Sequence, residues 1–185
     1  MDLKGKSVGV GITGGIAAYK ACEVVSTLRK AGADVFCIMT KNATEFVTPL
    51  TFESLSNNPV AVDMFDRIKS WEVEHIALAR RADLFVIAPG TANFIAKINA
   101  GICDDMLTTT IVATKAPVLI CTAMNVNMFE NPITQRNIAS LKELGYLFLG
   151  PEVGWLAEGV SGAGRMTEAK DIVKRVEMIL CAEKI

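Results

Sequence analysis

Short, continuous runs of apolar residues recur along this 185-residue chain, separated by segments with helical spacing. Strands that are apolar on both faces are typical of a parallel sheet covered by helices. The runs predict strands at Ser7–Ile12, Val35–Met39, Leu84–Ala88, Val118–Cys121 and Tyr146–Leu149. The spacing around them predicts helices at Ile16–Lys30, Ala43–Ser56, Val73–Arg80, Ala92–Asn99, Asp104–Ala113, Pro132–Leu144 and Thr167–Ala182. This alternation indicates an α/β fold with a doubly wound parallel sheet of the Rossmann type.

Composition narrows the class of protein. Apolar residues make up 51% of the chain and the net charge is -1. With this length and composition, we expect residues 1–185 to form one globular domain. No basic stripe is present, so a nucleic-acid partner is not expected. The five cysteines are scattered without a Cys-x-x-Cys pair, which favours reduced thiols over disulfides or a metal site. We find neither a signal-peptide pattern nor an apolar run near the ~20 residues that cross a bilayer, and we expect a cytoplasmic protein.

Two strand ends carry turns that suit an anion. In a doubly wound sheet, ligands bind beyond the carboxyl ends of the strands. Thr13–Gly15 follows the first strand and precedes a helix, whose N-terminal N–H groups favour a phosphate. Thr40–Asn42 follows the second strand and offers a hydroxyl to the same group. From local sequence alone, the first segment is more often a tight turn, and the second is explained equally well as a helix cap.

Three later segments carry a family resemblance. They are Pro89–Phe94, Thr122–Phe129 and Gly162–Met166. In the homo-oligomeric flavin-containing cysteine decarboxylases, the corresponding motifs are Pro-Ala-Ser-Ala-Asn-Thr, Pro-x-Met-Asn-x-x-Met-Trp and Gly-x-Gly-Arg-Met. The chain resembles this family, with motifs in the same order, from Gly11 to about Ile172. The resemblance implies a flavodoxin-like domain that binds FMN.

The resemblance also implies which residues hold the cofactor. Those expected to contact FMN are Gly14, Gly15, Ile16, Thr40, Lys41, Asn42, Thr91, Ala92, Asn93, Phe94 and Ala123. The chain departs from the family in mild ways: Gly90 and Thr91 stand for Ala and Ser, Thr122 for Pro, and Phe129 for Trp. These changes preserve side-chain size or aromatic character, so the expected cofactor is still FMN.

His75 is the only histidine. A lone histidine at a helix start is more often a capping or core residue, but the family has its essential histidine in this Glu-His-Ile context. Its unperturbed pKa lies near neutrality, as proton transfer requires. The family reaction oxidises a cysteine thiol transiently to a thioaldehyde, by hydride transfer to FMN, so that carbon dioxide can leave. The resemblance assigns His75 to proton transfer and Asn125, otherwise a helix cap, to the substrate carboxylate.

The remaining expected substrate contacts are Met128, Gly164, Arg165 and Met166. The Gly-x-Gly-Arg-Met loop marks the coenzyme A branch of the family. That branch converts 4'-phosphopantothenoylcysteine to 4'-phosphopantetheine, and this is the reaction we expect. The arginine suits a substrate phosphate or carboxylate, although a solvated arginine is the simpler explanation of the residue alone.

Glu158 stands where this branch has a cysteine that donates a proton to the enethiolate. A carboxylic acid kept neutral by burial could replace it, which makes Glu158 a third expected catalytic residue. Alternatively, the reductive half-reaction is absent and an enethiol is released, as in relatives that decarboxylate peptide C-terminal cysteines. Non-catalytic, flavin-binding regulatory subunits are a further alternative, which the presence of His75 and Asn125 disfavours. The family assembles as trimers or larger oligomers, so a homo-oligomer (trimer or dodecamer) is expected.

Overall fold

A computed structural model describes residues 2–65, 74–157, 159 and 161–181. Its main sheet is parallel, with the strand order β3-β2-β1-β4-β5-β6. The strands are β1 (Ser7–Ile12), β2 (Asp34–Met39), β3 (Val60–Ala61), β4 (Leu84–Gly90), β5 (Val118–Thr122) and β6 (Leu147–Leu149). The predicted doubly wound α/β fold is therefore confirmed.

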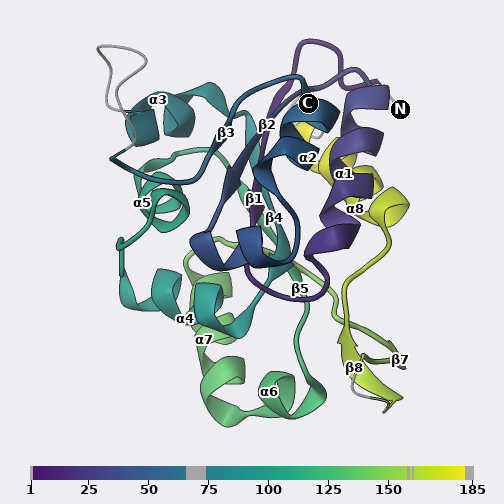
Figure 1. Cartoon of the computed structure of the whole chain (residues 1–185). Coiled ribbons are helices and arrows are strands. Elements are labelled where there is room, and N and C mark those ends of the chain that lie inside the picture. The colour runs from purple at the N-terminus through teal and green to yellow at the C-terminus, as the bar shows by residue number, and fades with distance from the viewer. Residues whose placement is uncertain (1, 66–73, 158, 160, 182–185) are drawn as a thin grey trace.

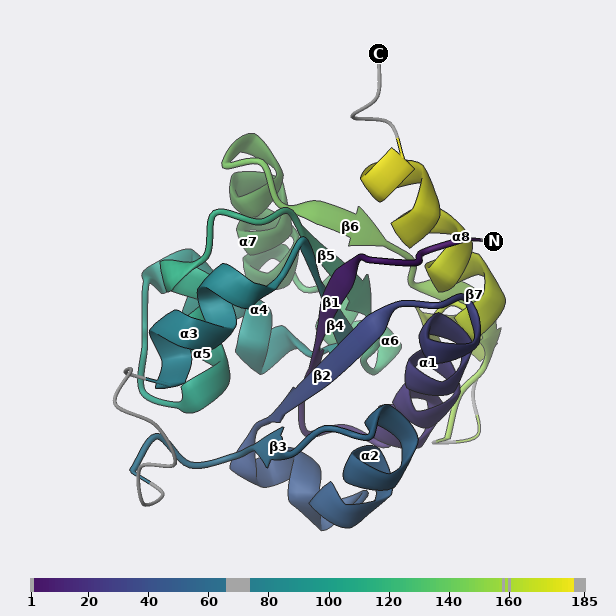
Figure 2. The same ribbon diagram turned by 90° about the horizontal axis from the view of Figure 1, so that it is seen from above.

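Helices cover both faces of this sheet (Figures 1 and 2). One apolar cluster joins the sheet to α1 (Ala18–Lys30), α2 (Pro49–Ser56) and α8 (Ala169–Cys181). A second cluster, on the other face, joins it to α3 (Glu74–Arg81), α4 (Ala92–Ala100), α5 (Met106–Ala113) and α7 (Pro132–Glu143). Every residue of β4 is buried, as the continuous apolar run predicts.

The structure corrects the prediction of a single helix over Ala43–Ser56. A short 3-10 helix, η1 (Lys41–Glu45), is followed by α2, which starts at Pro49. Proline has no N–H and disfavours a helical conformation in the residue before it. Thr48 is accordingly extended, with φ -75° and ψ 151°. The helix must break there.

Four short elements were not predicted. They are β3, α6 (Val126–Glu130), and the antiparallel pair β7 (Glu152–Trp155) and β8 (Ser161–Arg165). None is longer than five residues, so hydrophobic periodicity has too few positions to reveal them. The β7–β8 pair lies beyond the carboxyl ends of the main strands, on the side of α1 (Figures 1 and 2).

Within the described residues, no helix is both long and apolar enough to cross a membrane. In the same part of the chain, no three His, Cys, Asp or Glu side chains are grouped to hold a metal ion. The cysteines differ sharply in exposure: Cys37 and Cys121 are buried in the sheet, whereas Cys181 is exposed at the end of α8.

These environments predict thiol reactivity. Burial raises the pKa of Cys37 to about 12 and also raises that of Cys121. Because the thiolate is the reactive form, we expect iodoacetamide at about pH 8 to label Cys181 in the native protein. Cys37 and Cys121 should react only after unfolding, as peptide mass spectrometry would show. Native labelling of Cys121 at the rate of Cys181 would contradict the buried sheet.

Candidate active site

The site begins where the strand order reverses, between β1 and β4. This reversal opens a crevice at the carboxyl ends of the strands. Thr13, nearly buried at the end of β1, donates its hydroxyl to the carbonyl oxygen of Pro89 at 2.6 Å. The same hydroxyl lies 3.1 Å from the Oγ1 of Thr91, which caps α4 by accepting from the Phe94 N–H. The ends of the two strands are thereby held together.

The turn after β1 lies against the turn after β2. A Cβ atom at Gly14 would lie 2.5 Å from the Cβ of Asn42, closer than side-chain carbons approach in proteins. Only glycine permits this contact. Thr40 caps η1 by accepting the Ala43 N–H at 3.3 Å, and α1 begins at Ala18, just past the first turn. Two helix N-termini thus begin beside the same point, a geometry that suits a bound phosphate.

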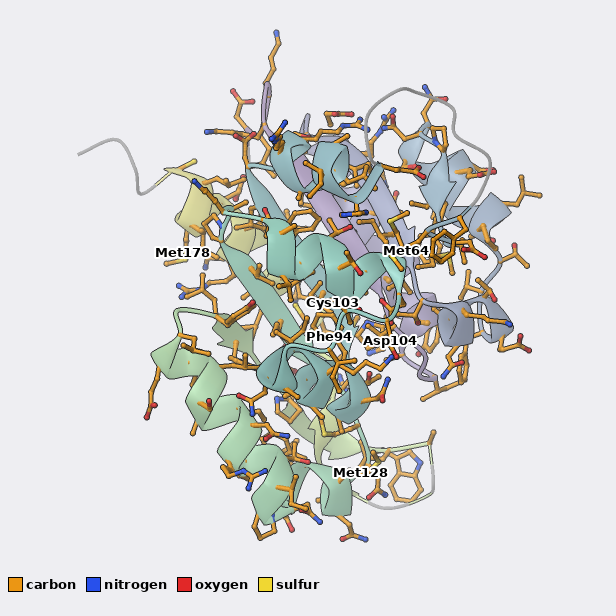
Figure 3. All side chains as sticks on the ribbon, turned by 90° about the vertical axis from the view of Figure 1, so that its left-hand side faces the viewer. Met64, Phe94, Cys103, Asp104, Met128 and Met178 are labelled. Atoms are coloured by element: carbon orange, nitrogen blue, oxygen red, sulfur yellow. The ribbon has the colours of Figure 1, made fainter. Side chains whose placement is uncertain are left out.

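A polar cavity of about 240 Å³ opens at this point. Its lining residues are Thr13, Gly14, Thr40, Lys41, Asn42, Thr91, Asn93, Phe94, Lys97, Asp105 and Thr108. Lys97 pairs with Asp104 at 2.7 Å and Asp105 at 3.3 Å, and the hydrogen bond to Asp104 raises the pKa of Lys97. Figure 3 shows Asp104 beside Cys103 in the connection between α4 and α5. The carboxylates fix the ammonium group at one wall of the cavity.

A larger cavity, of about 730 Å³, adjoins the first and shares Gly14, Thr91 and Asn93 with it. The remaining lining residues are Gly15, Ile16, Ala17, Tyr19, Lys20, Pro89, Ala92, Ala123, Met124, Asn125, Met128, Trp155, Leu156, Ala157, Gly164, Arg165 and Met166. Small-molecule sites typically enclose about 300–1,000 Å³ and are mostly apolar with a few polar groups. This cavity has that size and composition.

The far wall of the larger cavity is the segment after β5. The Ala123 N–H donates to the carbonyl oxygen of Gly90 at 3.2 Å, and the Met124 N–H donates to that of Gly164 at 3.1 Å. Asn125 then caps α6, its Oδ1 accepting from the N–H groups of Asn127 (2.8 Å) and Met128 (3.3 Å). Met128 lies on α6, in the lower part of the molecule in Figure 3.

Gly164 allows β8 to dock on this wall. A Cβ atom there would lie 2.2 Å from the carbonyl oxygen of Met124 and 3.1 Å from the methyl groups of Leu156. The Gly164→Ala variant is therefore expected to lose about 1–3 kcal/mol of unfolding free energy, because the backbone oxygen cannot move aside. Urea unfolding would measure this. Ser161→Ala, an exposed position on the same strand, should be near neutral; equal stability of the two variants would contradict the close docking.

The structure brings together nearly all the residues predicted for the site. Each of the predicted cofactor residues lines at least one of the two cavities, and each of the predicted substrate residues lines the larger one. His75 does not line either cavity. It is half-buried in the first turn of α3, on the opposite face of the sheet from α1 (Figures 1 and 2). Glu158 lies outside the described residues.

Sequence reasoning missed several lining residues. Tyr19 and Lys20 lie in the first turns of α1, and Trp155 ends β7. The only signal for Tyr19 and Lys20 in the sequence was their nearness to the Gly14 turn, which α1 follows.

Comparison with known proteins agrees with this geometry. A family model described as "Flavoprotein" matches residues 1–180. The chain belongs to the flavoprotein family. The coenzyme A biosynthesis bifunctional protein CoaBC of Bacillus subtilis (strain 168) is 48% identical over 175 residues, which are 95% of this chain and 43% of that protein. The chain thus spans less than half the length of this relative.

Two solved flavoprotein structures cover almost the whole chain. A PPC decarboxylase mutant complexed with pantothenoylaminoethenethiol is 32% identical, with a TM-score of 0.83 over 94% of this chain and 97% of that one. The FMN-dependent cysteine decarboxylase SpaF is 29% identical, with a TM-score of 0.85 over 97% of this chain and 99% of that one. The chain therefore shares its fold with these two decarboxylases over at least 94% of its length.

Proposed function

We propose that the chain binds FMN and decarboxylates 4'-phosphopantothenoylcysteine to 4'-phosphopantetheine, a step of coenzyme A biosynthesis carried out in the cytoplasm. The observation that supports this most is the larger cavity, where Thr91, Ala123 and Asn125 meet beside the Gly14 turn. The relatives named for coenzyme A biosynthesis and for PPC decarboxylation add independent support.

The residues present fit FMN. The Gly14 and Asn42 turns approach closely enough to hold a phosphate between two helix N-termini, and the Thr40 side chain lies at the same cavity. Thr91, Ala92 and Ala123 line the adjoining apolar cavity, which suits a planar ring system. When bound, FMN would accept a hydride from the substrate and so supply the electron sink that loss of carbon dioxide requires.

The chain's own residues would position the substrate and move protons. Asn125 lies at the wall of the cavity, and its amide N–H groups can donate to a carboxylate while its oxygen caps α6. Orientation of a reacting group contributes strongly to the rate. His75 would take the thiol proton, because an imidazole is the side chain that most often serves as a general base.

Because His75 lies outside the cavities of its own chain, we propose a homo-oligomer in which the histidine reaches the cavity of a second copy. Its helix α3 packs on α5 and starts on the face opposite α1, so no small adjustment would bring the ring beside Asn125. A trimer or dodecamer, the assemblies implied by the family resemblance, would satisfy this need.

Glu158 would return a proton to the enethiolate at the end of the reaction. Its neighbours Leu156 and Ala157 line the larger cavity, which supports a role there. The Glu158→Gln variant should still release carbon dioxide but accumulate an oxidised enethiol, because glutamine cannot donate a proton as an acid does. Product analysis by mass spectrometry measures this; an unchanged yield of saturated thiol would remove Glu158 from the mechanism.

A direct test uses the purified chain with substrate labelled in the cysteine carboxyl group. The proposal expects protein-bound FMN and release of labelled carbon dioxide. Protein that carries no flavin, or that leaves the carboxyl group in place after reconstitution with FMN, would contradict it.

A further inference from the structure

The larger cavity has an uneven charge distribution. Among the described residues that line it, the charged ones are Lys20 and Arg165, and both are cationic. No described carboxylate lines its wall. A cavity of this charge favours an anionic ligand, since an opposite charge in a partly desolvated site strengthens the interaction.

One carboxylate, from outside the lining, holds both cations. The Oε1 atom of Glu168 lies 3.3 Å from the Nζ of Lys20 and 2.7 Å from a terminal nitrogen of Arg165. The two cations therefore flank a single oxygen atom, although they come from α1 and β8. Hydrogen bonding to Lys20 lowers the pKa of Glu168, so this group is ionised at neutral pH. The three side chains together carry one net positive charge.

Lys20 lies at a position where it does not stabilise its own helix. It lies in the first turn of α1, where the positive end of the helix dipole disfavours a cation. No acidic residue lies in that turn to offset it. Local rules that a sequence breaks tend to mark functional positions. The helix N-terminus and the Lys20 ammonium group therefore both place positive charge at the wall of the cavity.

Arg165, the second cation, is held in place by packing. Its side chain lies over Gly154, where a Cβ atom would come within 2.9 Å of the Arg165 Cδ. Its Nε is buried and has no acceptor among the described residues. Arginine suits phosphate groups because its donors form a planar fork.

We propose that Lys20 and Arg165, held together by Glu168, form the subsite for the phosphate group of the substrate. This inference rests on the proposed function, because it takes the substrate to be a phosphorylated pantothenoyl thiol. A phosphate monoester carries up to about two negative charges near neutrality. It therefore interacts with two neighbouring cations more strongly than a ligand with a single carboxylate would. The other anions have separate sites: the flavin phosphate at the Gly14 and Asn42 turns, and the substrate carboxylate at Asn125.

The test compares the binding of 4'-phosphopantetheine and pantetheine, which differ only in the phosphate group, to the flavin-loaded chain by calorimetry. Wild type should prefer the phosphorylated ligand. Lys20→Gln should lower the affinity for 4'-phosphopantetheine by about tenfold or more, as loss of a charge-assisted hydrogen bond does. It should leave the affinity for pantetheine unchanged. Arg165→Gln should act in the same direction. Lys30→Gln, at the exposed far end of α1, is the matched control and should change neither affinity.

Three results would overturn the proposed phosphate subsite. Wild type could bind both ligands with equal affinity, Lys20→Gln could lose the same affinity for both ligands, or Lys20→Gln could lose FMN. The third would assign Lys20 to the cofactor phosphate instead. The proposed function fails separately, if the phosphate preference is present but the wild-type chain does not decarboxylate phosphopantothenoylcysteine.

Discussion

Replacement of His75 by asparagine is expected to lower decarboxylation by about 10²–10⁴-fold, the range typical of a lost general acid or base. FMN should stay bound, because the residues expected to hold it, which line the two cavities, are unchanged in this variant. Steady-state rates and the flavin absorbance of the purified variant measure the two effects. Glu74→Gln, the exposed neighbour in α3, is the control and should keep wild-type rates.

The location of His75 gives this prediction a second part. If the histidine serves the cavity of another copy, oligomers assembled from His75→Asn and Asn125→Asp chains contain some sites with both native residues. Mixed oligomers should therefore regain part of the activity that each variant lacks alone. A His75→Asn protein with wild-type rates would contradict the catalytic role, and mixtures without any recovery would contradict the shared site.

The Asn125→Asp variant is expected to lower kcat/KM by about 100-fold or more. Aspartate preserves the cap of α6, because its oxygen can still accept from the N–H groups of Asn127 and Met128. It replaces an amide donor by a negative charge, which would repel the substrate carboxylate in a confined cavity. The fold should persist while substrate recognition is lost.

Asn131 provides a matched control. It caps α7 in the same way, its Oδ1 accepting from the Ile133 N–H at 2.9 Å, but it does not line either cavity. Asn131→Asp should keep both activity and unfolding midpoint. An Asn125→Asp enzyme with a kcat/KM near that of the control would show that the carboxylate is bound elsewhere.

The sequence predicted the parts of the fold that depend on long apolar patterns. The run Leu84–Ala88 has five consecutive buried residues, so its strand and its burial on both faces could both be inferred. Because parallel strands end at one edge, the Gly14 and Thr91 turns could also be placed beside the same site.

The parts that escaped prediction depend on contacts rather than on patterns. The β7–β8 pair is built around Gly154 and Gly164, and its docking is fixed by the carbonyl oxygen of Met124, which is distant in sequence. The pairing of Lys20 with Glu168 spans 148 positions. A linear sequence cannot show which cavity His75 faces either, because that depends on the helix packing and on the assembly.

The mass of the product formed from 4'-phosphopantothenoylcysteine tests the account most directly. A saturated thiol, lighter than the substrate by one carbon dioxide, is the predicted result. A product that has also lost two hydrogen atoms would point to the oxidative reaction of the peptide-cysteine decarboxylases and would remove Glu158 as the proton donor. Substrate recovered with its mass unchanged, from protein that carries FMN, would contradict the proposed decarboxylation.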